Sequence, residues 1–160
     1  MILMNRFSIG RWLFSLNVLI VGVGGFLADW NATHLSNPNW PPHAKFHNGQ
    51  TMATGVLLAL ASLFFVWRRS GDRKTNVLAA VIFGVMLYWT QAAANLFPRT
   101  AWTDPEFLTS GQSLTDFSPQ IYLDLGMTVL VLFSAWLTWP TTVDSDKRGQ
   151  LPTHIQAKVD

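Results

Sequence analysis

The stretch DWNATHLSNPNWPPHAKFHNGQTMAT, residues 29–54, decides how the rest of this sequence is organised. It holds three of the four histidines of the chain and lies between two long apolar runs. Proline fixes its own φ and disfavours helix at the preceding residue, so Pro38, Pro41 and Pro42 predict an extended or turning loop. Because proline is tolerated in the first turn of a helix, we expect a helix to begin beside Pro41 and Pro42.

The predicted helix carries polar side chains along one face. These side chains, at spacings of four, three and four residues, are His43, His47, Gln50 and Thr54. Residues at such spacings lie on one side of a helix. The stripe runs from a loop into an apolar segment, where polar groups are costly and usually serve a site. The stretch therefore predicts a functional site at the edge of a membrane.

The composition is that of a membrane protein. Of the 160 residues, 49% are hydrophobic and only 12% are charged, against about 25% in soluble domains. Four apolar segments are each near the roughly 17–25 residues that a membrane helix needs. We expect an all-α, integral membrane four-helix bundle in residues 1–140, with helices at about 7–28, 43–67, 76–97 and 119–139. Residues 141–160 are polar, lack periodicity and are predicted to form a disordered tail.

The basic residues predict how the bundle is oriented. Nine of the eleven lie at the termini or between the second and third apolar segments, on one side of a four-span topology. Lys45 and Arg99 are the two on the other side. By the positive-inside rule both termini are cytoplasmic, and the histidine stretch faces outward from an inner, plasma or endoplasmic reticulum membrane. The net charge of only +2 gives no indication of nucleic-acid binding, and the absence of cysteine excludes disulfides and thiolate ligands.

The other three apolar segments also carry polar residues in their outer halves. Asp29 ends the first segment, and Asp124 lies about one turn inside the fourth, where a carboxylate is expected to avoid lipid. The third segment has Tyr88, Gln91 and Asn95 on one face. Helix bundles build ligand sites from facing side chains, so these residues predict a shared pocket. The alternative is that the polar groups only join the helices to one another.

Three kinds of chemistry fit such a pocket. His43 and His47, at i and i+4, have the spacing of a divalent-metal site, with Asp29 or His34 as a third ligand. A single histidine could instead bind haem iron as a proximal ligand. The third possibility needs no cofactor, because a histidine and Asp124 could exchange protons with a lipophilic substrate. The residue pattern leaves all three open.

Residues 40–49, with the sequence WPPHAKFHNG, carry a resemblance to known families. The wider stretch NPNWPPHAKFHNGQTM resembles a group of small four-span membrane proteins of unknown function. The tryptophan, the histidine and the following Asn48 and Gly49 also resemble those of the styrene oxide isomerases. That family consists of four-span trimers that bind haem b, whose ferric iron acts as a Lewis acid on an epoxide during isomerisation to an aldehyde.

The resemblance to the isomerases implies roles for particular residues. It implies His43 as the haem ligand, Asn48 as a substrate-contacting amide and Asn95 as the asparagine of the third helix. Two positions depart from the family pattern: Gln91 stands where the family has a tyrosine, and His47 is additional.

We therefore expect an integral membrane enzyme that acts on a small lipophilic substrate in an outward-facing pocket, by an isomerase or epoxide-type reaction assisted by haem b or a divalent metal. The residues expected in catalysis are Asn48, Tyr88, Gln91, Asn95 and Asp124, and those expected to bind cofactor or metal are His43, His47 and Asp29. The expected partners are the lipid bilayer, the substrate and further copies of the chain, as a trimer by analogy. The alternative function is a non-catalytic subunit that binds a pigment, a lipid or a partner helix within a larger membrane complex.

Overall fold

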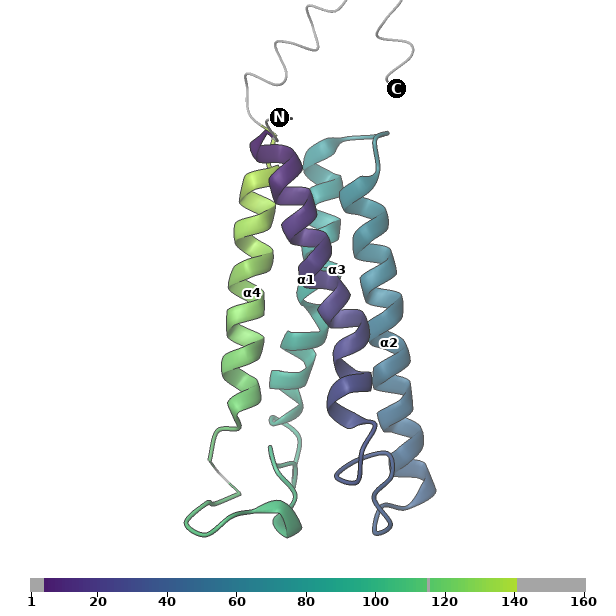
Figure 1. The fold of residues 1–160 in the computed structure, drawn as a ribbon, viewed down its shortest axis with the longest axis vertical. Coiled ribbons are helices and arrows are strands. Elements are labelled where there is room, and N and C mark those ends of the chain that lie inside the picture. The colour runs from purple at the N-terminus through teal and green to yellow at the C-terminus, as the bar shows by residue number, and fades with distance from the viewer. Residues whose placement is uncertain (1–4, 115, 141–160) are drawn as a thin grey trace, which may run out of the picture.

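The computed structural model describes residues 5–114 and 116–140, and the secondary structure in this part of the chain is all-helical. The elements are α1 (Arg6–Asp29), α2 (Pro42–Trp67), α3 (Arg73–Ala94), the short 3-10 helix η1 (Pro105–Phe107) and α4 (Pro119–Thr138). The four long helices form the bundle shown in Figure 1. Each of them is long and apolar enough to cross a membrane. The predicted tail, 141–160, lies outside the described residues.

The ends of α3 differ most from the predicted range of 76–97. The helix begins earlier, at Arg73, because the Asp72 carboxylate caps it by accepting a hydrogen bond from the Thr75 backbone N–H at 2.7 Å. This bond and a second one from the Thr75 hydroxyl lower the pKa of Asp72. The helix also ends earlier, at Ala94, since proline disfavours helix at the residue before Pro98. Asn95 consequently caps the helix instead of lying within it.

Helix α1 leans across the bundle from α4 to α2 (Figure 1). Near its start, Gly10 lies against α4 so closely that an added Cβ would stand 2.6 Å from Leu137 Cβ. Near its end, Gly22 and Gly25 lie against α2. Gly55 of α2 completes that contact, because a Cβ there would stand only 2.8 Å from the Val21 carbonyl oxygen. Small residues thus let the helix backbones approach closely at both contacts, as in membrane helix pairs.

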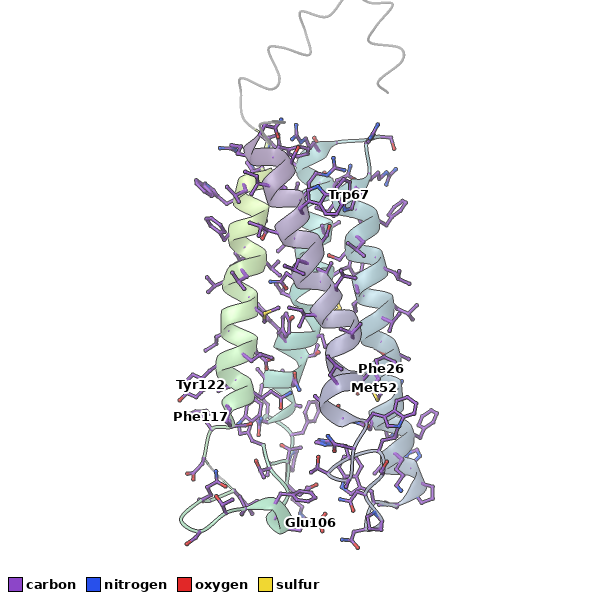
Figure 2. The ribbon with its side chains drawn as sticks, in the orientation of Figure 1. Phe26, Met52, Trp67, Glu106, Phe117 and Tyr122 are labelled. Atoms are coloured by element: carbon purple, nitrogen blue, oxygen red, sulfur yellow. The ribbon has the colours of Figure 1, made fainter. Side chains whose placement is uncertain are left out.

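The bundle interior is apolar, and so is most of its outer surface. Phe14, Val18 and Val131 are fully buried between the helices. Large apolar side chains such as Leu57 and Val129 instead project outward and are more than half exposed. Figure 2 shows such side chains around the bundle. Soluble monomers rarely expose contiguous apolar surface of this extent, so the outer surface is suited to lipid.

Gly10→Ala is expected to destabilise the bundle. The new Cβ would meet Leu137 Cβ at 2.6 Å and the Ser134 carbonyl oxygen at 2.9 Å, so α1 and α4 must move apart. Overpacking of this kind should lower the free energy of unfolding by about 1–3 kcal/mol, measured by thermal unfolding in detergent. Gly126→Ala is the matched control, because nothing lies within 4 Å of its Cβ position. Equal stability of the two variants would contradict the close contact between α1 and α4.

Candidate functional site

A cavity of about 450 Å³ lies between the four helices, in the half of the bundle that leads to the two long connections. Its walls are largely apolar, with Val21, Met52, Leu87 and Leu123 among the residues that line it. Its polar lining residues are Asp29, Thr51, Tyr88, Thr90, Gln91, Gln120 and Asp124. Small-molecule sites in helix bundles have this character, a mostly apolar space with a few convergent polar groups.

Asp124 is the residue of this cavity whose burial most needs an explanation. Its side chain is only 4% exposed, and neither carboxylate oxygen has a hydrogen-bond partner among the described residues. The chain places it there because Ser118 caps α4 and Pro119 occupies the first turn, which leaves Asp124 inside the helix and on its buried face. A buried carboxyl group without partners is costly, so such a group usually serves a function.

Tyr88 brings a second unpartnered polar atom to the same cavity. Its side chain is 5% exposed, and its hydroxyl has no hydrogen-bond partner in the part of the chain that the structure describes. The ring belongs to a buried apolar cluster with Val21 and Met127. Tyr88 and Asp124 are close enough to interact electrostatically. The cavity therefore combines a phenol donor with a carboxyl group, and both are free to bind a polar group of a ligand.

Asp29 lines the cavity from the end of α1, and Asn48 of α2 holds it in place. The Asn48 side-chain amide donates to Asp29 Oδ2 at 3.0 Å, and His34 Nε2 lies 4.0 Å from Asp29 Oδ1. Asn48 does not line the cavity itself, and its link to the cavity is this hydrogen bond to Asp29. Gln91 of α3 lines the cavity directly, whereas Asn95 lies beyond the end of α3 and does not.

His43 and His47 of α2 do not line the cavity. Both side chains are exposed, as are those of Gln50 and Thr54 on the same stripe. The two Nε2 atoms are 3.0 Å apart, and Nδ1 of His47 lies 3.1 Å from Gln50 Oε1. None of these four residues lines the cavity, so the polar residue that α2 contributes to it is Thr51 and not the histidine stripe. The buried face of α2 carries Met52, Gly55 and Ala59 instead, because small residues are needed where α2 meets α1.

The predicted metal ligands are not brought together. Asp29 faces the cavity and binds Asn48, so it does not join the pair formed by His43 and His47. Within the described residues, no group of three or more histidine, aspartate or glutamate side chains is placed to hold a metal ion. The histidine pair thus offers two imidazole nitrogens at the protein surface, and it does not line the cavity.

The two long connections are fastened to each other below the cavity end of the bundle. Glu106 of η1 accepts hydrogen bonds from the side-chain amides of Asn37 and Asn39, both at 2.7 Å. Trp40 Nε1 donates to Asp104 Oδ2 at 3.2 Å. Figure 2 labels Glu106 at this end of the molecule. The contact joins residues more than sixty positions apart. In the sequence, the only indication of it was the length of the connection between α3 and α4.

Sequence reasoning also left out three polar residues that line the cavity. Gln120 precedes Asp124 by four residues, so the i, i+4 spacing was a usable signal. Thr51 and Thr90 bond to the carbonyl oxygens of His47 and Met86 of their own helices, at 3.1 and 2.8 Å. Threonines commonly do this in helices, so nothing distinguished these two in the sequence.

Asp124→Leu is expected to stabilise the protein. Leucine fills a similar volume and removes a buried carboxyl group whose oxygens lack partners. We expect the free energy of unfolding to rise by about 1–3 kcal/mol, measured by thermal unfolding in detergent. Asp104→Leu serves as the control and should not stabilise, because Asp104 accepts a hydrogen bond from Trp40. A marked loss of stability in Asp124→Leu would show that this carboxyl group has a structural role.

Comparison with known proteins places the chain in a family. No curated protein and no solved structure matches it. The sequence profile of one protein family matches residues 13–130, a range that contains α2, α3 and every residue lining the cavity. This agrees with the resemblance to four-span proteins of unknown function and adds nothing on the styrene oxide isomerases. The chain belongs to the family of unknown function DUF6640.

Proposed function

We propose that this protein spans a bilayer four times, in an inner, plasma or endoplasmic reticulum membrane, with both termini in the cytoplasm. The four long apolar helices and their apolar outer surface support the insertion. The charge distribution supports the orientation. One end of the bundle carries Arg6, Arg11, Arg68, Arg69, Arg73 and Lys74, and the other carries Lys45 and Arg99.

In this orientation the cavity lies in the outer half of the membrane, and its ligand is a small lipophilic molecule with one polar group. The observation that carries this proposal is the buried Asp124, whose carboxylate oxygens lack partners inside an otherwise apolar cavity. A ligand with a polar group beside Asp124 and Tyr88 would satisfy atoms that the protein leaves unpaired. Its apolar part would contact Val21, Met52 and Leu87.

The chemistry that this arrangement supports best is acid–base isomerisation. Protonated Asp124 would donate its proton to the ring oxygen of an epoxide as the carbon–oxygen bond breaks, and Tyr88 would donate a hydrogen bond to the same oxygen. A hydride then moves between the adjacent carbons, and the hydroxyl proton returns to Asp124. The product is a carbonyl compound of unchanged composition, so no oxidant or reductant is consumed. Gln91 and Gln120, which line the cavity, would orient the substrate.

We propose His43 and His47 as the ligands of the predicted haem b or divalent metal. Imidazole nitrogens are suitable ligands for both, but His43 and His47 face outward from α2. A group bound there would need a neighbouring copy of the chain to cover it, as in the trimer that the resemblance implies. The visible absorption spectrum and metal content of the purified protein decide between these cofactors and cofactor-free chemistry. A Soret band that His43→Ala abolishes would assign haem to this residue.

The rival function is a non-catalytic subunit of a larger membrane complex. The exposed apolar faces of the helices could contact partner helices as well as lipid, and the cavity could hold a pigment or lipid without changing it. This function predicts a fixed set of copurifying membrane proteins and no turnover by the isolated chain. The enzymatic function predicts turnover by the purified protein alone.

Topology reporters test the orientation. A reporter fused after Asp160 should be cytoplasmic, because the basic residues of the bundle lie at the end shared by both termini. A tag inserted between Gly111 and Ser113 should be accessible from outside intact cells. The reverse result for both positions would overturn the orientation and move the cavity to the cytoplasmic half of the membrane.

Asp124→Asn should leave the protein folded and remove the proton transfer. We expect turnover of an epoxide probe such as styrene oxide to fall by about 10²–10⁴-fold, the usual contribution of a general acid or base. Tyr88→Phe should lower turnover less, since it removes a hydrogen bond and not the proton donor. Thr54→Val is the control, because Thr54 is exposed and does not line the cavity. Undiminished turnover in Asp124→Asn would contradict the proposed mechanism.

A further inference from the structure

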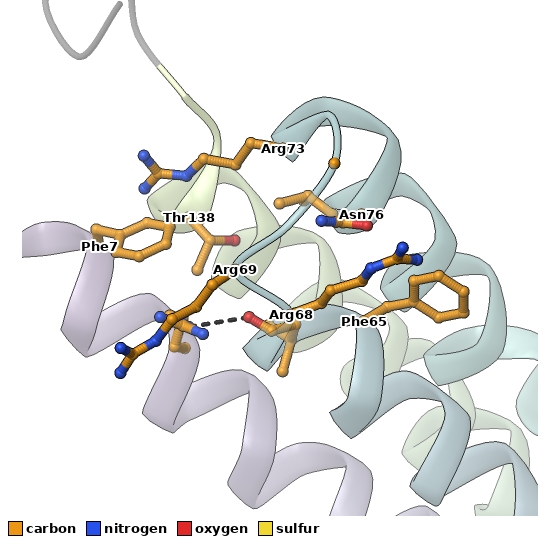
Figure 3. Close-up of a pocket in the computed structure, with 11 residues that line it drawn as sticks. Phe7, Phe65, Arg68, Arg69, Arg73, Asn76 and Thr138 are labelled. Atoms are coloured by element: carbon orange, nitrogen blue, oxygen red, sulfur yellow. Dashed lines mark hydrogen bonds between the residues drawn. The ribbon is translucent and has the colours of Figure 1, made fainter. Parts of the chain in front are cut away.

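A second pocket, of about 380 Å³, lies at the other end of the bundle. Four arginines line it: Arg11 from α1, Arg68 and Arg69 just after α2, and Arg73 at the start of α3. Figure 3 shows the last three around the turn between α2 and α3, next to Thr138 of α4. The pocket thus draws on all four helices, although none of its residues belongs to the Asp124 cavity.

Three of the four arginines of this pocket, Arg11, Arg68 and Arg69, have no acidic partner in the part of the chain that the structure describes. Asp72, the acidic residue of the α2–α3 turn, is instead engaged in capping α3. Several guanidinium groups around one pocket give a strong positive potential, which attracts an anion. Guanidinium groups bind phosphate oxygens particularly well, because their N–H groups can form two parallel hydrogen bonds.

Two of the guanidinium groups are held in position by the bundle itself. Arg11 Nε donates to the Val66 carbonyl oxygen at 2.9 Å, and its Cζ lies 4.2 Å from the centroid of the Trp67 ring. Arg73 Cζ lies 3.5 Å from the centroid of the Phe7 ring. These contacts fix the planes of both groups before any ligand binds, which lowers the entropic cost of binding.

The remaining walls of the pocket are apolar, and this decides what kind of anion fits. Phe7, Phe65, Val66 and Val77 lie among the arginines. The exposed indole rings of Trp12 and Trp136 lie near the same end of the bundle, as expected of tryptophans at a membrane interface. A free phosphate ion would use only the arginines. A phospholipid would place its phosphate on the arginines and its acyl chains on the apolar surface beside them.

We propose that this pocket binds the headgroup phosphate of an anionic phospholipid from the leaflet at the termini. Basic pockets between membrane helices on the cytoplasmic side are suited to such headgroups. The proposal rests on the proposed membrane insertion and orientation, and it is independent of the chemistry at Asp124. Binding there ties α1, the α2–α3 turn and the end of α4 to one lipid molecule.

Lipid binding by the full-length protein in detergent tests this proposal. Native mass spectrometry measures the affinity for dioleoyl phosphatidylglycerol, with dioleoyl phosphatidylcholine as the zwitterionic comparison. The wild-type protein should prefer phosphatidylglycerol. Arg68→Gln/Arg69→Gln should bind it about thirtyfold more weakly, since each arginine near an anionic lipid is worth about fivefold. Among the described residues the Arg69 side chain has no hydrogen bond and the Arg68 side chain has only one, to Ser70 at 3.3 Å, so the variant should fold.

The control variant is Lys45→Gln/Arg99→Gln, which removes the same charge from the other end of the bundle and should bind like the wild type. If the double arginine variant is unfolded, Arg69→Gln alone replaces it, with about fivefold weaker binding expected. Equal affinity for the two lipids, or equal loss in the control variant, would overturn the proposal. Displacement of phosphatidylglycerol by millimolar inorganic phosphate would also overturn it, in favour of a free anion.

The lipid-binding experiment and the tests of the proposed function can fail independently of each other. Topology reporters that show no insertion or the reverse orientation would refute the basis of both proposals. A correctly inserted protein whose Asp124→Asn variant keeps full turnover would refute the catalytic mechanism and leave lipid binding standing. The arginine variants should keep turnover, because no arginine lines the Asp124 cavity.

Discussion

The close backbone contacts of α1 are the constraint on which the rest of the structure depends. Gly10 brings α1 against α4 at the end shared by the termini, and Gly22 and Gly55 bring it against α2 further along. A straight helix that touches α4 at one end and α2 at the other must diverge from α4 in between. The cavity lies where α1 has moved to α2, between the second half of α1 and the first turns of α4.

This geometry explains why polar groups can remain unpaired inside an apolar bundle. Elsewhere, Ser62 donates to the Ala80 carbonyl oxygen at 2.7 Å, and Asn17 donates to the Met127 carbonyl oxygen at 3.2 Å while its Oδ1 has no partner among the described residues. Asp124 and Tyr88 face a space that no neighbouring helix fills. Polar groups that only joined helices would bond to the neighbouring helix as Ser62 does, so the contrast favours a ligand site over a packing role at Asp124 and Tyr88.

The two ends of the bundle differ in a way that suits a membrane with two different faces. The end with the termini carries arginines around a pocket with apolar walls. The other end carries carboxylates, both in the cavity and in the hydrogen bonds that join the long connections through Glu106 and Asp104. In the proposed orientation, the first arrangement would face the anionic headgroups of the cytoplasmic leaflet, to which it is suited.

The sequence by itself determined the four helices, because apolar length and prolines act locally along the chain. It also placed Tyr88 and Gln91, three residues apart, on one face of α3, and the tertiary structure brings that face to the same cavity as Asp124. Only the tertiary structure decided that His43 and His47 are exposed and do not line this cavity. Spacing gives the relation between residues on one helix but not the rotation of that helix about its axis. In α2 the apolar residues occupy every side, so the rotation is set by the contact of Gly55 with α1.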